Sequence, residues 1–271
     1  MSELKTVAVI GAGTMGGGIG AILLMNGRHV RLYDPFDESL QKARARLVKR
    51  GEEGARERLL LTTNLEEACQ GADYVIEAVP EKLELKRDIF SKLDRFAPPH
   101  AVLATNTSEL SVTAIAAATK RPERVIGMHW FNPPERMRLI EIVRAVQTSD
   151  ETLAMTVQLS HLCGKEKVVV KDAQGFVTTR ALAALLGEAM RMLEEGVASA
   201  EDIDTAVKLG LNHPMGPLEL ADYVGLDTML YISESMTEAL GERFRATQTL
   251  RKLVEAGRLG RKSGQGFYRY E

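Results

Sequence analysis

A glycine-rich turn near the amino terminus restricts the fold of this chain more than any other feature. The sequence Gly11-Ala-Gly13-Thr-Met15-Gly16 directly follows the short apolar run at 7–10, and helical spacing follows the turn. A buried strand, a G-x-G-x-x-G turn and a helix are typical of the first βαβ unit of a dinucleotide-binding sheet. The glycines there allow a tight turn and close approach of the backbone to a pyrophosphate. We therefore predict that Gly11, Gly13, Met15 and Gly16 contact a dinucleotide.

An acidic residue stands where such a unit needs one. The alternating run at 29–33 predicts a second strand, and Asp34 follows it, 21 residues after Gly13. A carboxylate at this position accepts hydrogen bonds from the adenine ribose. Because the same carboxylate would repel a 2′-phosphate, NAD rather than NADP is the expected cofactor.

Strand-like runs recur along the first two thirds of the chain. We predict further strands at 74–79, 101–105, 124–129, 139–143 and 168–170, with helices between several of them and a charged helix over 36–60. This alternation favours a Rossmann-type α/β fold with a doubly wound, mostly parallel sheet. This alternation stops near Asp172, and helical spacing dominates from Phe176 onward. The sequence therefore predicts an NAD-binding domain over 1–172 and a smaller all-α domain over 173–271.

Charge and cysteine content argue against several other classes of protein. The net charge of −2 lacks the basic excess of a nucleic-acid binder. Cys69 and Cys163 are isolated and the five histidines have no metal-ligand spacing, so we expect no metal and a reducing, cytoplasmic setting. The charge-free stretch 7–27 is long enough for a membrane span. Its seven glycines favour a strand and a turn instead, so no membrane association is expected.

Polar residues follow two of the predicted strands at the ends where ligands bind in open α/β sheets. Ser108 either donates to a substrate oxygen or caps the next helix. His129 ends the run at 124–129, and Glu141 comes 12 residues later inside the apolar run at 139–143. If these strands are neighbours, Glu141 can hold one imidazole nitrogen and leave the other as a base. Alternatively, Glu141 lies on a sheet edge and faces water.

Longer segments of the chain resemble the L-3-hydroxyacyl-CoA dehydrogenases, which include bacterial 3-hydroxybutyryl-CoA dehydrogenases. The matching segments occur in the family's order, at 11–18, 75–81, 106–112, 124–134, 139–143, 202–226 and 257–268. The resemblance implies an enzyme of fatty acid metabolism, as in β-oxidation. It would oxidise the 3-hydroxyl of a short- to medium-chain acyl-CoA with NAD, giving a 3-ketoacyl-CoA and NADH. A homodimer formed through the helical domain, which would also bind substrate, is implied as well.

The resemblance also implies roles for individual residues. His129 matches the general base, Glu141 the carboxylate that orients it, and Ser108 a serine that contacts substrate and nicotinamide. Positions that contact the cofactor in the family correspond here to Glu81, Lys86, Asn132 and Lys262. Lys86 is also expected to reach the coenzyme A.

Three positions depart from the family pattern. Thr179 stands where many members have an active-site asparagine, and we expect it to bind substrate through its hydroxyl. The helical arm that helps to bind coenzyme A is shortened to 36–60, and Glu109 follows Ser108 where a small residue is common. These departures keep two alternatives open: an NAD-dependent dehydrogenase of a free hydroxy acid such as gulonate, and a non-catalytic NAD-binding structural protein.

Overall fold

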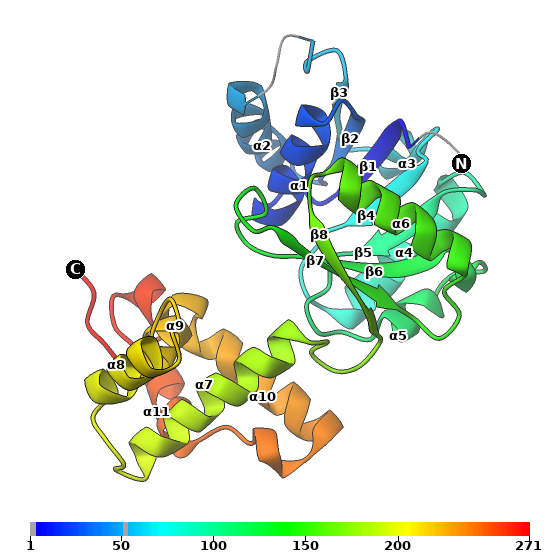
Figure 1. The fold of residues 1–271 in the computed structure, drawn as a ribbon. Coiled ribbons are helices and arrows are strands. Elements are labelled where there is room, and N and C mark those ends of the chain that lie inside the picture. Colours follow the sequence, from blue (N-terminus) through cyan, green and yellow to red (C-terminus); the bar gives the residue numbers. More distant parts are fainter. Residues whose placement is uncertain (1–3, 51–53) are drawn as a thin grey trace. The chain divides into compact units, whose positions relative to one another are not determined.

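The computed structural model describes residues 4–50 and 54–271, and the chain divides into two compact units (Figure 1). The first unit ends at Phe176, and the second is Val177–Glu271. The sequence placed this boundary after residue 172.

The first unit is built on an eight-stranded sheet with the order β3-β2-β1-β4-β5-β6-β7-β8. The strands are β1 (Thr6–Ile10), β2 (His29–Tyr33), β3 (Leu59–Thr62), β4 (Tyr74–Glu77), β5 (Val102–Thr105), β6 (Val125–Trp130), β7 (Leu139–Arg144) and β8 (Glu166–Lys171). All neighbours are parallel except β6 and β7, which are antiparallel. The strand order reverses between β1 and β4, which is where open sheets of this type bind ligands. The predicted Rossmann-type fold is confirmed.

Helices cover both faces of this sheet (Figure 1). One apolar layer contains α1 (Thr14–Met25), α2 (Asp37–Arg50) and α6 (Asp150–Leu162). The other contains α3 (Leu65–Cys69), α4 (Leu83–Phe96) and α5 (Val112–Ala116), and a 3-10 turn, η1 (Pro122–Arg124), precedes β6. Side chains alternate between the layers along each strand, so Val9 and Ile10 belong to opposite cores.

The single helix predicted over 36–60 is wrong. α2 ends at Arg50, and Leu59–Thr62 forms β3, which pairs with β2 at the edge of the sheet. Residues 51–53 lie outside the described part of the chain. β3 is a short continuous apolar run without alternation, and such a run cannot be distinguished from a helix end by periodicity.

The second unit is helical and has its own apolar core. It contains α7 (Thr178–Glu194), α8 (Ala200–Gly210), α9 (Pro217–Val224), α10 (Leu226–Leu240) and α11 (Gln248–Glu255), with 3-10 turns η2 (Glu242–Phe244) and η3 (Arg261–Ser263). The Ser199 hydroxyl accepts a hydrogen bond from Asp202 N and so caps the start of α8. Among the described residues, no helix is long and apolar enough to cross a membrane.

A buried carboxylate on α9 makes most of the hydrogen bonds that hold the carboxyl-terminal tail of the second unit, and Asp204 on α8 accepts one more from the Tyr268 hydroxyl at 2.9 Å. Asp222 is 1% exposed and accepts hydrogen bonds from Phe267 N, Tyr268 N and the Tyr270 hydroxyl at 2.9–3.0 Å. A Cβ atom at Gly266 would lie 1.9 Å from the Asp222 carboxylate. A side chain at this glycine is therefore excluded by contact, and the tail packs directly on α9.

Candidate active site

The glycine turn after β1 forms a backbone cradle. A Cβ atom at Gly11, which has φ +106°, would lie 2.7 Å from Ala78 O, and one at Gly16 would lie 1.8 Å from Gly11 O. Gly13 is exposed and has no atom within 4 Å of its Cβ position. No side chain caps the amino terminus of α1. Open space beside uncapped helix amides is what a dinucleotide pyrophosphate requires, so these residues fit NAD.

Asp34 joins the end of β2 to this cradle. Its Oδ2 accepts from Ala12 N at 2.9 Å, and its Oδ1 accepts from Phe36 N at 3.1 Å. The carboxylate is therefore fixed beside the turn, at the sheet edge where the strand order reverses. Met15 is half-buried on the first turn of α1.

His129 and Glu141 face each other across β6 and β7. The two are directly paired in the antiparallel ladder, and His129 Nδ1 lies 2.8 Å from Glu141 Oε2. His129 is 5% exposed and Glu141 is 0% exposed. Because β8 pairs with the other side of β7, Glu141 does not lie on a sheet edge. Of the two alternatives left open by the sequence, the pairing is the one observed.

Two aromatic rings pack beside the histidine and one amide holds the strand that carries it, and the sequence did not identify these three residues. The Phe131 ring centroid is 4.4 Å from that of His129, and the Phe176 centroid is 5.8 Å away. Asn106 Oδ1 accepts a hydrogen bond from Trp130 N at 2.8 Å, which ties the end of β5 to the strand that carries the histidine. Phe131 lies two residues from His129, so an i, i+2 spacing was a usable signal for it, whereas the contacts of Phe176 and Asn106 join segments that lie far apart in the sequence.

Ser108 lies exposed on the loop that follows β5. It is not the cap of the next helix, because the Ser111 hydroxyl accepts from Ala114 N at the start of α5. Instead, the backbone at Ser108 is held by Glu81, whose Oε1 accepts from Ser108 N at 2.7 Å and from the Thr107 hydroxyl at 2.5 Å. Glu81 thus links the loop after β4 to the loop after β5.

Lys86 lies inside the first unit rather than on its surface. Its side chain is 0% exposed, and its Nζ lies 2.8 Å from Glu77 Oε1 and 3.3 Å from Glu81 Oε2. In this arrangement the side chain of Lys86 exposes no surface to a cofactor or to coenzyme A. Glu77 was missed by sequence analysis, although a carboxylate inside the apolar strand 74–77 was a usable signal.

The remaining predicted site residues lie on separate segments. Asn132 is exposed on the loop after β6. In the second unit, Thr179 is buried in the first turn of α7, and Lys262 Nζ pairs with Asp227 Oδ1 at 2.5 Å. The structure brings His129 to Glu141 and Ser108 to Glu81. Thr179 and Lys262 stay predictions for the site.

Comparison with known proteins decides the family. The model of the 3-hydroxyacyl-CoA dehydrogenase NAD-binding domain matches residues 6–173, and that of the C-terminal domain of the same family matches 175–270. The chain belongs to the 3-hydroxyacyl-CoA dehydrogenase family. It is similar to a probable 3-hydroxybutyryl-CoA dehydrogenase of Bacillus subtilis, with 46% identity over 99% of this chain and 98% of the relative. It is also similar to the human mitochondrial hydroxyacyl-coenzyme A dehydrogenase, with 39% identity over 99% of this chain and 92% of the relative.

A solved structure of this family has the same fold over nearly the whole chain. The (S)-3-hydroxybutyryl-CoA dehydrogenase from Ralstonia eutropha superposes with a TM-score of 0.95 at 40% identity, covering 99% of this chain and 100% of the other. The predicted family, the enzymatic activity and the NAD cofactor are therefore confirmed. This chain is an NAD-dependent dehydrogenase of 3-hydroxyacyl-CoA.

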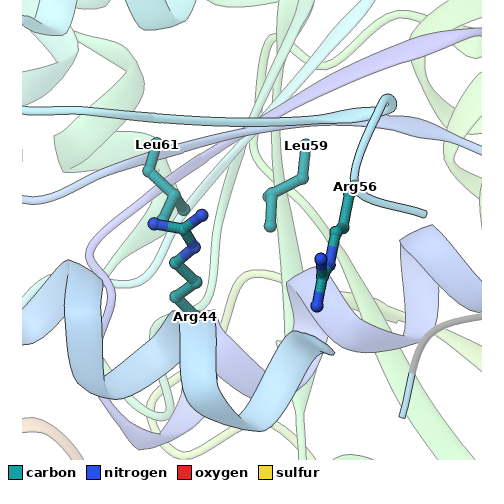
Figure 2. Close-up of a pocket in the computed structure, with 4 residues that line it drawn as sticks. All are labelled: Arg44, Arg56, Leu59 and Leu61. Atoms are coloured by element: carbon teal, nitrogen blue, oxygen red, sulfur yellow. The ribbon is translucent and has the colours of Figure 1, made fainter. Parts of the chain in front are cut away.

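In this dehydrogenase, a separate hollow lies between α2 and β3. Figure 2 shows Arg44 on α2 and Arg56 before β3 beside Leu59 and Leu61 of the strand. In the sheet, β2, β1, β4 and β5 lie between this strand and β6, which carries His129. The hollow is therefore separate from the histidine site.

Proposed function

We propose that the enzyme oxidises short- to medium-chain 3-hydroxyacyl-CoA with His129 as the general base and Glu141 as the group that orients it. The buried 2.8 Å contact between His129 Nδ1 and Glu141 Oε2 carries this proposal. A carboxylate on Nδ1 fixes the tautomer in which Nε2 has a free electron pair. An imidazole held in this way is suited to accept the proton of the substrate hydroxyl.

The chain's own residues divide the remaining work. Bound NAD supplies the hydride acceptor, while His129 accepts the hydroxyl proton as the C–H bond at carbon 3 breaks. Phe131 and Phe176 shield the imidazole from water. Ser108 donates to the substrate oxygen from its exposed loop, and Thr179 adds a second hydroxyl to the substrate side.

The proposed contacts to NAD come from the glycine turn after β1 and from the loops beside it. The backbone at Gly11, Gly13, Met15 and Gly16 faces the pyrophosphate, and Asp34 accepts from the adenine ribose. Glu81 and Asn132 contact the nicotinamide end, with Lys262 near it. Lys86 supports this end from behind through Glu81.

We further propose a cytoplasmic homodimer that assembles through the second unit and serves β-oxidation. The second unit carries several exposed apolar side chains, among them Leu209 at 79% and Leu211 at 69%. Sedimentation velocity checks the dimer. A species of monomer mass at micromolar protein would contradict it.

A substrate panel tests the activity. We expect the enzyme to consume NADH with acetoacetyl-CoA, followed by absorbance at 340 nm. His129→Ala should lower kcat by about 100-fold or more without a change in circular dichroism. Turnover of free 3-hydroxy acids or gulonate in preference to acyl-CoA would favour the free-acid alternative. NAD binding without turnover of any hydroxy substrate would favour a structural protein.

A further inference from the structure

A fully buried carboxylate lies behind the Ser108 loop. Glu77, the last residue of β4, is 0% exposed and all its carboxylate oxygens are used. Oε1 accepts from Val79 N at 2.7 Å and from Lys86 Nζ at 2.8 Å, and Oε2 accepts from the Thr105 hydroxyl at 2.7 Å. Glu77 therefore joins the carboxyl ends of β4 and β5 to α4.

Lys86 connects Glu77 to a second carboxylate, that of Glu81. Its ammonium has three donors, and it meets Glu77 Oε1 at 2.8 Å, Val79 O at 3.3 Å and Glu81 Oε2 at 3.3 Å. With one oxygen directed at Lys86, Glu81 presents the other to the next loop. That oxygen accepts from Ser108 N at 2.7 Å and from Glu109 N at 3.3 Å. A continuous path thus leads from Glu77 to the backbone of Ser108.

A contribution to folding stability does not by itself account for the buried ion pair of Glu77 and Lys86. Burying two charges has a large desolvation cost, and apolar replacements of buried ion pairs are often neutral or stabilising. The path ends at the carboxyl edge of the sheet, on the layer to which Val75 and Leu103 belong. His129 and Glu141 point to the same layer, because Val125 lies four residues from His129 on β6 and Val143 lies two residues from Glu141 on β7, and even separations share one face of a strand.

We propose that Glu77 is a positioning residue, which acts through Lys86 and Glu81 to fix the loop that carries Ser108. This inference rests on the proposed role of Ser108 in binding the substrate oxygen. Glu77 itself does not touch substrate or cofactor. A displacement of about 1 Å in a group that binds the reacting oxygen is enough to slow an enzyme strongly.

Kinetics with acetoacetyl-CoA and NADH provide the first test. We expect Glu77→Gln to lower kcat by about 10- to 100-fold. The double variant Glu77→Gln/Lys86→Met removes the uncompensated ammonium, so its thermal midpoint should return toward that of the wild type while kcat stays low. In a Ser108→Ala background, Glu77→Gln should change kcat by less than about threefold, because residues on one path are not additive. Recovery of kcat in the double variant, or a full effect without Ser108, would overturn the proposal.

The matched control is another ion pair, whose acidic member lies on the same helix as Lys86. Asp94 on α4 pairs with Arg121 Nε at 3.0 Å, and the two side chains are 10% and 12% exposed. Asp94→Asn should lower the thermal midpoint without changing kcat. A loss of kcat equal to that of Glu77→Gln would show that any buried pair on α4 has the same effect, which contradicts a specific role.

Hydrogen exchange tests the positioning without any substrate. In Glu77→Gln/Lys86→Met, the amide of Ser108 should exchange at least about tenfold faster than in the wild type, while amides of the β4–β5 ladder keep their rates. Unchanged exchange at Ser108 would refute the path. If the wild type proves inactive with acetoacetyl-CoA but exchange at Ser108 responds, the proposed function fails and the positioning role stands.

Discussion

At the scale of single residues, removal of the Glu141 carboxylate should affect catalysis more specifically than any other single change, lowering kcat and leaving substrate binding intact. Glu141→Gln keeps the shape of a side chain that is 0% exposed but replaces a charged acceptor by an amide that can also donate to Nδ1. We expect kcat to fall about 100-fold or more while KM for acetoacetyl-CoA changes little. Steady-state kinetics measure both.

The control for this change is a carboxylate outside the site. Glu151 is exposed at the start of α6, where Oε1 pairs with Arg124 Nη1 at 3.1 Å. Glu151→Gln should keep kcat within about twofold, as expected for an exposed ion pair. If Glu141→Gln retains more than half of the wild-type kcat, the orienting role is wrong.

Thr179 allows a test of the position that departs from the family. Thr179→Val removes the hydroxyl and keeps the branched shape. Because a lost hydrogen bond weakens binding by about 1 kcal/mol, KM for acetoacetyl-CoA should rise about fivefold with KM for NADH unchanged. Unchanged kinetics would remove Thr179 from the substrate site.

Residue spacing predicted part of the site and left the rest undecided. The separation of His129 and Glu141 suggested a pair, but only the antiparallel ladder decides it, because the same spacing fits an edge strand. Lys86 was expected to contact the cofactor or coenzyme A. Its pairing with Glu77 depends on how α4 packs on β4, which local sequence does not specify.

At the scale of elements, the contact of the tail with α9 should dominate the stability of the second unit. Asp222→Ala leaves two backbone amides and the Tyr270 hydroxyl without their acceptor. We expect the free energy of unfolding of this unit to fall by about 2–4 kcal/mol, measured by circular dichroism in urea. Gly266→Ala should also destabilise, because a Cβ atom would meet the Asp222 carboxylate at 1.9 Å.

Two measurements sharpen this prediction. Burial and the hydrogen bond to Asp222 raise the pKa of Tyr270 to about 12, so Asp222→Ala should lower it toward the ordinary value of 10.0 in an ultraviolet titration. Glu201→Ala, an exposed acid in the first turn of α8, serves as the control and should change stability by less than about 0.5 kcal/mol. Equal losses from both variants would argue against a special role for Asp222.

Element types were largely predictable, while β3 was not. Strands such as 7–10 and 139–143 are bounded by glycine or polar residues, and their tertiary partners agree with their pattern. β3 is a strand because it pairs with β2. Its four residues are all half-buried or buried, so their hydrophobicity does not alternate and gives no local signal for a strand. Tertiary pairing therefore decided what local pattern could not.

At the scale of the whole molecule, the reactivity of the two thiols measures whether the apolar layers on the two faces of the sheet are intact. Cys69 belongs to the α3–α5 layer and Cys163 to the α1–α6 layer. Burial raises the pKa of each thiol to about 12. At pH 8 the thiolate is then about one part in ten thousand, so a disulfide reagent should leave both thiols intact in the native protein.

Unfolding should expose both thiols together. Because one sheet supports both layers, we expect Cys69→Ala and Cys163→Ala to show the same dependence of labelling on guanidinium concentration for the thiol that remains. Absorbance of the released thiolate measures it. Rapid labelling of one thiol in native protein, or two clearly separate transitions, would show that the layers open independently.

The antiparallel turn between β6 and β7 has a consequence for how this enzyme tolerates change. His129 and Glu141 lie on one hairpin, so their relation depends on the ladder of two adjacent strands and not on any distant loop. Insertions in the other crossovers, including a shortened or extended arm after β2, leave this pair untouched. Deletion of one residue within either strand would turn a side chain to the opposite face and separate the pair. The pair therefore tolerates changes of length in the other connections of the sheet and tolerates none within β6 or β7.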